Sequence, residues 1–396
     1  MRPFDCAVIG GGASGITAAI SAKRAGKTCV LLEKTPRLGR KLLASGNGRC
    51  NLLNESLDES FYNPASRTLV KSVFAKFNKN ATADFFRSVG VYIEKDADGR
   101  YFPATNQSAT VLKALEIELK KLAVPVELDF DVAAIHSSGG GFIVTAKSGR
   151  KVPCGSAILT CGGMSYPSFG SDGSAYKLAR HFGHRIIEPV PVCVSLVVKD
   201  PILHPLQGQR ITVKASAHIE GKVAAESSGD MLFTKYGLSG TAILDISESI
   251  SVALNRERKR NIQVSVDMVP DLDLKGLERA VRERSDGGLA DEDLLTGILP
   301  NKFGIAMKNL LKTKDAAAIA GRLKNWSFRV IQTRGWNEAE FTAGGIDTRE
   351  VKEGTLESKL QKGLYFAGEC LDVNGARGGY NLAWAWASGF VAGKHE

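Results

Sequence analysis

The sequence lacks any apolar run long enough to cross a lipid bilayer. The longest, Leu382–Gly393, is shorter than the roughly 20 residues that a membrane helix needs. Met1 leads within a few residues into an apolar strand, which leaves no room for a signal peptide. We therefore expect a cytoplasmic protein with no membrane contact.

Metal binding and disulfide formation also have little support. The seven cysteines stand at irregular positions, with neither a C-x-x-C motif nor a pair of neighbouring histidines. Disulfide frameworks and zinc sites both need such regular spacings. We expect reduced, mostly buried thiols and no metal.

Length and composition indicate a soluble protein of several domains. The chain has 396 residues, of which 43% are hydrophobic and 24% charged. This composition is typical of a folded globular protein, and the length exceeds what one core usually holds. Two or three domains are expected.

The first fifteen residues carry the strongest motif. The apolar run Asp5–Ile9 is followed by Gly10–Gly15, which has the form G-x-G-x-x-G, and by a helix-forming stretch, Ile16–Lys23. The first glycine permits a tight turn, the second lets the backbone approach a pyrophosphate, and the third lets the helix pack on the strand. Free N–H groups at the helix start would hold the pyrophosphate. The pattern predicts a dinucleotide-binding site.

An acidic residue follows the second strand at the distance that such sites require. The strand Thr28–Leu32 ends at Glu33, which lies 33 − 15 = 18 residues beyond Gly15. A carboxylate about 20 residues after the motif accepts hydrogen bonds from the adenosine ribose. The strand, the glycine loop, the helix and Glu33 therefore follow one another at the spacing of a dinucleotide-binding site.

A second glycine-rich loop spans Ala44–Asn51. Gly46 and Gly48 flank an asparagine, so the backbone can lie flat against a planar ligand. Arg49 is suited to a phosphate or an anionic ring, and Cys50 to proton donation if it is partly exposed. The alternative for Cys50 is a small buried apolar side chain, the usual state of a cysteine.

Two later strands also end in glycines. Ala157–Gly163 ends in a pair of glycines, and Gly363–Glu369 runs into Gly-Glu before Gly375–Asn381 and a helix over Leu382–Gly393. The carboxyl ends of parallel strands lie beside the ligand of an open sheet. Glu369 is there placed for the ribityl hydroxyls of a flavin, and the helix start for an electron-rich ring edge.

From Pro189 onward, the pattern changes to short strands without long helices between them. It predicts an inserted antiparallel barrel or sandwich, followed by a helical sub-insertion at Leu272–Leu323. The expected strands are Val192–Val198, Ile211–Ile219, Met231–Thr234, Ala242–Ile246 and Ile262–Met268. The expected boundaries are 1–188 and 339–396 for the nucleotide-binding domain, 189–269 and 325–338 for the barrel, and 270–324 for the helical insert.

The formal net charge of +10 is concentrated in one segment. Between Ile298 and Arg334 there are eight basic residues and one acid, Asp315, which gives 8 − 1 = +7. The basic residues are Lys302, Lys308, Lys312, Lys314, Arg322, Lys324, Arg329 and Arg334. Either this is a solvated helical surface, or it is a patch that follows the phosphates of a nucleic acid.

Several motifs together resemble the YhiN/BaiN-like (RdsA-type) FAD-dependent flavoproteins, from end to end of the chain. They are Gly10–Gly15, Gly39–Leu43, Ser45–Asn51, Leu232–Thr234, Tyr236–Gly240, Gly368–Glu369 and Gly378–Asn381. The resemblance implies an α/β fold: a Rossmann-like FAD-binding domain of the glutathione-reductase type with an inserted antiparallel β-barrel and a small helical sub-insertion. The sequence departs from the family pattern at Lys235, Thr241 and Ala175, where histidine, proline and glycine are common.

The resemblance implies FAD, rather than NAD, in the Gly10–Gly15 site. The motifs and the resemblance together give the expected FAD contacts, which are Gly10, Gly12, Ala13, Ser14, Gly15, Glu33, Lys34, Arg40, Lys41, Ser45, Gly46, Asn47, Gly48, Arg49, Cys50, Asn51, Val132, Thr160, Cys161, Gly162, Gly163, Gly368, Glu369, Gly379, Tyr380, Asn381 and Leu382. Only one dinucleotide motif is present, so NAD(P)H would bind transiently at the flavin face as the reductant.

Activities in the resembling family differ: reduction of a uridine in large-subunit ribosomal RNA, oxidation of a small amino ketone, and a reductive step on bile acids. The leading hypothesis is an FAD-dependent reductase of a uridine in 23S ribosomal RNA. Flavin N5 would deliver hydride to one carbon of the pyrimidine double bond, and Cys50 or Tyr380 would protonate the other.

Under this hypothesis, the RNA or a pre-ribosomal particle would contact Lys235, Tyr236, Lys302, Lys308, Lys312 and Lys314. The second hypothesis is an oxidase or reductase of a small metabolite, such as an amino ketone or an enone, with no response to RNA. The third is a flavin-bearing binding factor without turnover.

Overall fold

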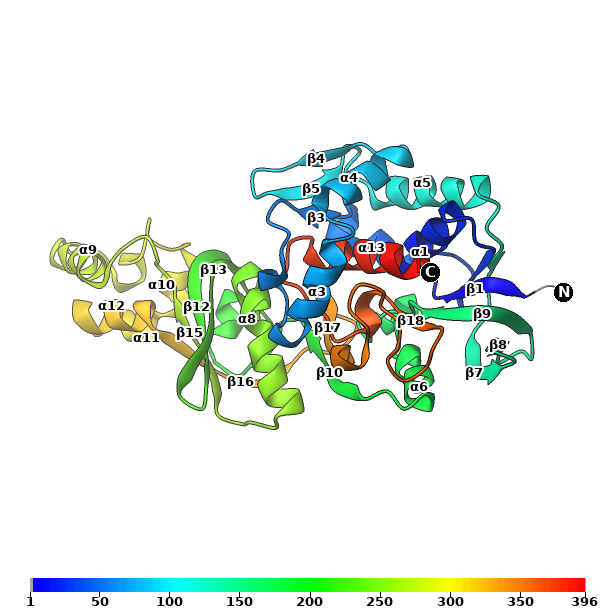
Figure 1. Ribbon diagram of the computed structural model, residues 1–396. Coiled ribbons are helices and arrows are strands. Elements are labelled where there is room, and N and C mark those ends of the chain that lie inside the picture. Colours follow the sequence, from blue (N-terminus) through cyan, green and yellow to red (C-terminus); the bar gives the residue numbers. More distant parts are fainter. Residues whose placement is uncertain (1–2, 396) are drawn as a thin grey trace. The chain divides into compact units, whose positions relative to one another are not determined.

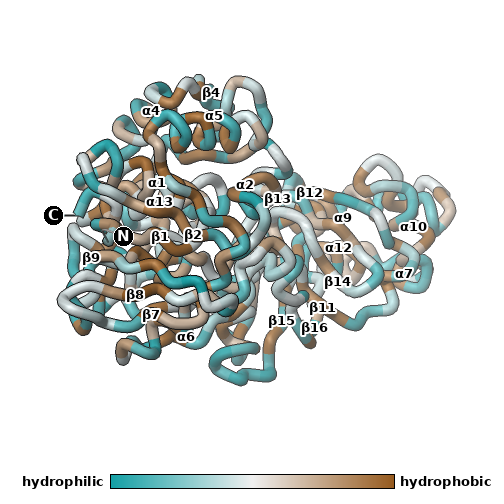
Figure 2. The backbone as a smooth tube through the Cα atoms, turned by 90° about the vertical axis from the view of Figure 1, so that its right-hand side faces the viewer, coloured by the Kyte–Doolittle hydropathy of each residue, from teal (hydrophilic) through white to brown (hydrophobic). Residues whose placement is uncertain are grey.

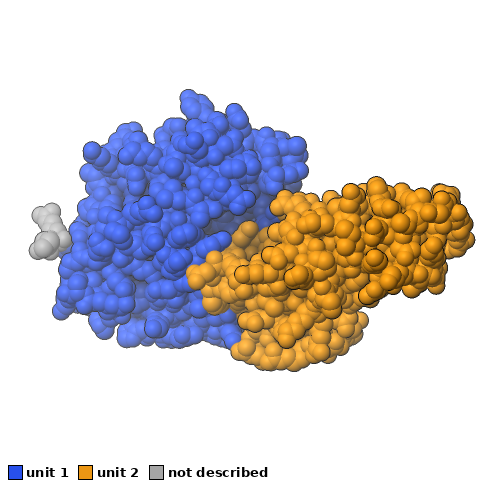
Figure 3. All heavy atoms as spheres, turned by 180° about the vertical axis from the view of Figure 1, so that it is seen from behind, with its two compact units in different colours: residues 1–189, 341–396 blue, residues 190–340 orange. Residues whose placement is uncertain are grey.

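The computed structural model describes residues 3–395 and divides the chain into two compact units. Unit 1 consists of Met1–Pro189 and Phe341–Glu396, and unit 2 is the continuous segment Val190–Glu340 (Figure 1, Figure 3). Each unit has its own hydrophobic core. The division into three domains stays a prediction.

Unit 1 is built on a seven-stranded sheet whose centre is parallel. The order is β6-β2-β1-β9-β8-β7, and β18 also pairs with β9. β1 (Phe4–Ile9) lies parallel to both β2 (Cys29–Leu32) and β9 (Lys151–Leu159). The other strands are β6 (Val126–Glu127), β7 (Val132–Ser138), β8 (Gly141–Ala146) and β18 (Leu364–Phe366). The central strands are buried apolar runs, as expected for a sheet covered on both faces.

The first and last long helices of the chain pack against each other. They are α1 (Ala13–Arg24) and α13 (Tyr380–Gly393). A Cβ added to Gly389 would lie 2.3 Å from the Ser14 carbonyl oxygen, and one on Gly393 would lie 2.2 Å from that of Ala18. The two backbones are therefore in direct contact, which only glycine permits. Figure 2 shows hydrophobic stretches along the central strands and α13.

The remaining elements of unit 1 surround this sheet. The helices are α2 (Arg40–Ala44), α3 (Arg67–Phe74), α4 (Lys79–Ser88), α5 (Ser108–Lys121) and α6 (Ser174–His181). A small antiparallel sheet has the order β3 (Leu53–Asn54), β5 (Arg100–Pro103), β4 (Ile93–Lys95). β10 (Ile186–Val192) runs through one unit boundary, and β17 (Phe341–Ile346) begins at the other.

Unit 2 contains a closed barrel of six antiparallel strands. Its order is β11-β14-β13-β12-β15-β16, and pairing of β16 with β11 closes it. The strands are β11 (Leu196–Val198), β12 (Arg210–Ile219), β13 (Lys222–Thr234), β14 (Gly237–Ser239), β15 (Ile262–Asp267) and β16 (Trp326–Thr333). Along β12, the side chains of Ile211, Val213 and Ala215 alternate into the core with exposed residues between them. The fold class predicted above is thus confirmed.

One predicted strand is a helix. We expected Ala242–Ile246 to be extended, but these residues lie in α8 (Thr241–Ser251). Ile243, Ile246 and Ile250 follow at steps of three and four residues and are all buried, so a helix places them on one face. A five-residue apolar run is too short to separate strand from helix. A π-helical turn, Val252–Arg256, continues α8.

The helical segment of unit 2 shares the core of the barrel. It contains α9 (Leu274–Asp286), α10 (Lys302–Ala306), α11 (Lys308–Leu311) and α12 (Ala316–Lys324), and α7 (Leu203–Leu206) lies earlier in the unit. The ring of Phe303 on α10 lies edge-on to that of Phe233 on β13, with centroids 5.7 Å apart. Nowhere in residues 3–395 is a helix both long and apolar enough to cross a membrane.

Candidate functional site

The glycine loop between β1 and α1 forms a concave backbone surface. Gly10 has a φ of +112°, and a Cβ there would lie 2.6 Å from the Thr160 carbonyl oxygen. A Cβ on Gly15 would lie 1.8 Å from the Gly10 carbonyl oxygen. At Gly12, by contrast, a Cβ would meet no atom within 4 Å. Among the described residues no side chain caps the start of α1, so its first N–H groups can bind an anion.

Glu33 lies beside this loop at the end of β2. Its Oε2 accepts a hydrogen bond from the Gly11 N–H at 2.7 Å, and its Oε1 accepts one from the Thr35 N–H at 2.8 Å. The Phe130 N–H donates to the Glu33 carbonyl at 2.9 Å, which brings the segment leading to Val132 to the same end of the sheet. The carboxylate is therefore held against the backbone of the glycine loop.

The end of β9 lies against the glycine loop. Thr160 Oγ1 donates to the carbonyl oxygens of Ile9 and Gly10, both at 2.8 Å. The Cys161 thiol points to the Ile9 carbonyl at 3.2 Å. Gly162 follows with a φ of +74°. The predicted residues at the ends of β1, β2 and β9 are thus brought together.

A third loop, which contains Ser171 and Asp172, covers the same region. Asp172 forms an ion pair with Lys34 at 2.8 Å, and Lys34 lowers the pKa of this carboxyl against the effect of burial. A Cβ on Gly162 would lie 2.8 Å from Ser171 Oγ. Arg40, also predicted, has its guanidinium 5.9 Å from the centre of the Phe169 ring in this loop.

Three buried polar atoms of unit 1 have neither a hydrogen-bond nor an ion-pair partner within the described part of the chain. They are Asn51 Oδ1, Ser171 Oγ and the Tyr176 hydroxyl. Burial raises the pKa of Tyr176 well above its ordinary value, and the Glu369 carboxyl adds to this. Because buried polar groups are rarely left unpaired, a bound polar ligand would explain all three.

Glu369 is held by three groups from distant parts of the chain. Its Oε2 accepts from Lys41 Nζ at 2.6 Å, and its Oε1 accepts from Ser165 Oγ at 2.7 Å and from the Thr342 N–H at 2.9 Å. The sequence pointed to Lys41 and Glu369 but missed Ser165 and Thr342. Ser165 follows the predicted Gly162–Gly163 turn closely, which is a usable indication, whereas Thr342 lies in a different strand with no motif of its own.

The loop from Ser45 to Asn51 distinguishes the two alternatives for Cys50. Gly46, Asn47 and Gly48 all have positive φ, as does Cys50 at +61°. The Cys50 side chain is fully buried, and burial raises its pKa to about 12. Of the two alternatives for Cys50, the structure favours the small buried apolar side chain, because the loop turns Cys50 into the core.

Arg49 lies on the outer side of this loop. Its guanidinium is centred 4.0 Å from the middle of the Phe102 ring, and its Nε donates to Asn106 Oδ1 at 3.1 Å. Ser45 Oγ donates to the Leu42 carbonyl at 2.6 Å. The loop is therefore fixed by its own side chains on both flanks.

The start of α13 lies at the other predicted glycine turn. Asn381 accepts from the Gly375 N–H and donates to the Gly375 carbonyl, both at 2.9 Å, which fixes the turn before the helix. Gly379 has a φ of +106°. The Tyr380 ring stacks on Phe61 with centroids 4.5 Å apart, and burial raises the pKa of its hydroxyl. Gly368 begins the turn that carries Glu369. Gly163 lies in the loop after β9, and Leu382 lies in the first turn of α13.

The predicted RNA contacts all belong to unit 2. Lys235 and Tyr236 form the turn between β13 and β14, and Arg334 lies over the Tyr236 ring at 4.4 Å. The lysines of the basic segment are exposed on or just after α10 and α11: Lys302, Lys308, Lys312 and Lys314.

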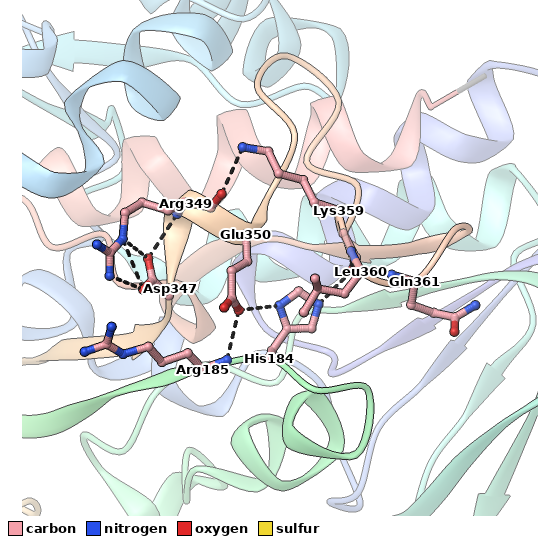
Figure 4. Close-up of polar contacts among 9 residues, drawn as sticks. His184, Arg185, Asp347, Arg349, Glu350, Lys359, Leu360 and Gln361 are labelled. Carbon is pink, nitrogen blue, oxygen red and sulfur yellow. Dashed lines mark hydrogen bonds and ion pairs between the residues drawn. The ribbon is translucent and has the colours of Figure 1, made fainter.

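A separate polar cluster in unit 1 has the outline of a Ser-His-Glu triad, of which Figure 4 labels His184 and Glu350. His184 Nε2 lies 2.7 Å from Ser358 Oγ, and Nδ1 lies 3.2 Å from Glu350 Oε2. Ser358 Oγ accepts the N–H groups of Leu360 and Gln361, so its own proton is directed at Nε2 and the ring proton at Glu350. With Ser358 only 1% exposed, this hydroxyl cannot reach a substrate. The cluster is structural, and burial lowers the pKa of His184 while Glu350 opposes the shift.

The parallel sheet, the glycine loop and the carboxylate after β2 define a dinucleotide-binding fold of the Rossmann class. The chain belongs to the family described as HI0933-like protein Rossmann domain, whose model matches residues 4–395. The resemblance drawn from the sequence motifs is thereby confirmed.

Curated relatives align over nearly the whole chain. A 3-dehydro-bile acid delta(4,6)-reductase from Clostridium scindens is 38% identical, with 98% of this chain and 97% of that protein covered. The ribosomal RNA dihydrouridine synthases of Escherichia coli and Haemophilus influenzae are 29% and 28% identical, with at least 96% of each chain covered.

Solved structures share the fold. A 3-ketosteroid delta1-dehydrogenase from Sterolibacterium denitrificans has a TM-score of 0.51 at 12% identity, with 99% of both chains covered. A quinol-fumarate reductase has a TM-score of 0.52 at 16% identity, with 100% of this chain and 71% of that chain covered. These likenesses concern the fold alone. The family membership and the whole-length relatives show that the protein is an FAD-dependent oxidoreductase.

Proposed function

We propose that this protein reduces a uridine of 23S ribosomal RNA to dihydrouridine in the cytoplasm, with NAD(P)H as the reductant. Two whole-length relatives are named ribosomal RNA dihydrouridine synthases. The observation on this chain that carries the proposal is a group of exposed lysines in unit 2 with no carboxylate partner among residues 3–395: Lys235, Lys302, Lys312 and Lys314. RNA phosphates would neutralise these charges.

The residues around the glycine loop fit FAD. The open space at Gly12 leaves room for a pyrophosphate at the start of α1, and Glu33 lies where a ribose would need an acceptor. Glu369, oriented by Lys41 and Ser165, would bind ribityl hydroxyls. When bound and reduced by NAD(P)H, the flavin would supply the hydride that adds to one carbon of the double bond.

Saturation of the uridine double bond also needs a proton at the second carbon. We assign this role to Tyr380, whose ring is held by Phe61 at the start of α13. Cys50 is the weaker candidate because its thiol is fully buried. A uridine must also be unstacked before its ring can reach any such group, so the RNA has to be bound firmly elsewhere.

The experiment maps dihydrouridine in 23S ribosomal RNA by mass spectrometry, in cells with and without the gene. We expect one dihydrouridine to be lost with the gene and restored when purified protein and NADH or NADPH act on the extracted RNA. An unchanged RNA would refute the proposal.

Charge reversal tests the contribution of the lysines. The variant combines Lys308→Glu, Lys312→Glu and Lys314→Glu, and the matched control reverses three exposed lysines of α5: Lys113, Lys120 and Lys121. Each lost phosphate contact should make the plot of log K against log salt shallower by about 0.7, as for single-stranded RNA. We expect the variant at Lys308, Lys312 and Lys314 to bind RNA more weakly at unchanged FAD content, and the α5 control to bind RNA like the wild type. Equal losses in both would show a general charge effect and count against this patch.

A second candidate is a reductase of a small cyclic enone, favoured by the 38% identity to a bile acid reductase. The two substrates share their chemistry, because in both the double bond is conjugated with a carbonyl group, so hydride adds to one carbon and a proton to the other. Incubation with a 3-keto-delta4 steroid and NADH or NADPH separates the candidates. Turnover of the steroid without any dihydrouridine phenotype would favour the second.

A further inference from the structure

The outward face of α10 and α11 combines three lysines with one exposed isoleucine. We define the α10–α11 face as Asn301, Lys302, Ile305, Lys308, Asn309 and Lys312, all of which are exposed. Lys302 and Ile305 lie on α10, and Lys308 and Lys312 lie on or just after α11, and all four are exposed. Ile305, in the middle, is 66% exposed.

The inner side of the same segment is rigidly packed. Phe303 and Leu311 are 0% exposed and Met307 is 2% exposed. A Cβ added to Gly304 would lie 1.9 Å from the Glu292 carbonyl oxygen, so the backbone of α10 directly contacts the backbone at Glu292. The exposure of Ile305 is therefore a fixed feature of the surface, since the segment cannot rotate to bury it.

The lysines of this face are only partly neutralised by carboxylates, unlike Lys214 and Lys324, which pair with Glu226 at 3.5 Å and with Asp267. On the α10–α11 face, Lys302 and Lys312 have no carboxylate partner within residues 3–395. Lys308 Nζ lies 3.9 Å from Glu292 Oε2, the outer limit of an ion pair.

We infer that the α10–α11 face binds RNA, with Ile305 packed against an unpaired base and the lysines on the flanking phosphates. This inference rests on the proposed function and names the surface by which the RNA is held. Aliphatic side chains, isoleucine among them, wedge between bases in nucleic-acid complexes, and the asparagine amides suit sugar or base edges. An acidic protein is a poorer fit, because the core of a protein interface needs a contiguous apolar patch. Here a single isoleucine stands among charges.

The test measures binding of the full-length, FAD-loaded protein to an unmodified transcript of 23S ribosomal RNA at several salt concentrations. The variants are Ile305→Ala, Ile305→Leu and the double variant Lys302→Ala/Lys312→Ala. The matched control is Ile117→Ala, since Ile117 is also a helical isoleucine, on α5, and is 57% exposed.

We expect Ile305→Ala to weaken binding by roughly five- to tenfold, the low end of base-stacking effects, without changing the salt dependence. Ile305→Leu should restore most of the affinity. The double lysine variant should weaken binding and flatten the salt dependence by about 0.7 per lost contact. Ile117→Ala should bind like the wild type.

Wild-type affinity in Ile305→Ala, or an equal loss in Ile117→Ala, would overturn the inference. Binding of the wild type to polyglutamate but not to RNA would also overturn it, in favour of an acidic protein. If these variants leave RNA binding unchanged while dihydrouridine still depends on the gene, the inference about the α10–α11 face is wrong and the proposed function stands. If dihydrouridine does not depend on the gene, the proposed function fails whatever the face binds.

Discussion

Replacing Gly12 with alanine should separate cofactor binding from folding. A Cβ on Gly12 would meet no atom within 4 Å, and the residue has a φ of −84°, which alanine readily adopts. Restricting the unfolded chain stabilises the fold by about 0.4–1 kcal/mol. The preference of a helix start for glycine over alanine acts in the opposite direction with similar size. The stability of the FAD-free protein should therefore change by less than about 1 kcal/mol.

FAD binding should respond differently, because the new methyl group would occupy the space proposed for the pyrophosphate. A hydrogen bond to a charged group contributes about 1.5–3 kcal/mol, so losing one weakens binding roughly ten- to hundredfold. The matched variant is Gly15→Ala. There the Cβ would lie 1.8 Å from the Gly10 carbonyl oxygen, and overpacking against backbone should cost about 3 kcal/mol or more.

Two assays on both variants decide the matter: urea unfolding of the FAD-free protein, and the FAD dissociation constant from quenching of flavin fluorescence. We expect normal stability with weak FAD binding for Gly12→Ala, and low stability for Gly15→Ala. Wild-type FAD affinity in Gly12→Ala would refute the placement of the pyrophosphate. Wild-type stability in Gly15→Ala would refute the close contact of α1 with the glycine loop.

Two further predictions concern protons. Tyr380→Phe should lower turnover with FAD content unchanged, whereas Cys50→Ala should leave turnover unchanged because the thiol is buried with its pKa raised to about 12. The reverse pattern in steady-state rates would reassign the proton donor to Cys50. For His184, burial holds the pKa below its ordinary value of 6.5, so the unfolded chain binds the extra proton more readily and the fold loses stability as the pH falls below 6.5. Urea unfolding at pH 7.5 and 5.5 measures how much free energy of unfolding is lost on acidification. This loss should be smaller in His184→Gln than in the wild type, and equal losses would contradict this account.

The nucleotide-binding half of unit 1 could be predicted closely because its signals are local. Asp5–Ile9 was expected as a strand and β1 spans Phe4–Ile9, and the turn to α1 follows from the positions of three glycines. Glu33 was found by counting residues, and it lies beside the glycine loop. In each case backbone sterics within a few residues dictate the conformation.

Other features depend on contacts across the fold, which the sequence does not display. Ser165, in the loop after β9, and Thr342, on β17, hold Glu369 from positions many residues away, and no spacing rule joins them. Cys50 could be exposed or buried until the positive φ values of its loop were known. The isoleucines of α8 fit a strand as well as a helix over five residues, and only their burial over a longer span decides.

The two-segment composition of unit 1 has a consequence for biosynthesis. Domains usually fold in the order in which they leave the ribosome. Here the continuous segment Val190–Glu340 emerges with all its barrel strands, while the N-terminal segment still lacks β18 and α13. Gly389 and Gly393, which complete the packing on α1, are made only after the barrel. Chains that stop before β18 would thus carry all the barrel strands but lack Glu369 and the helix that packs on α1.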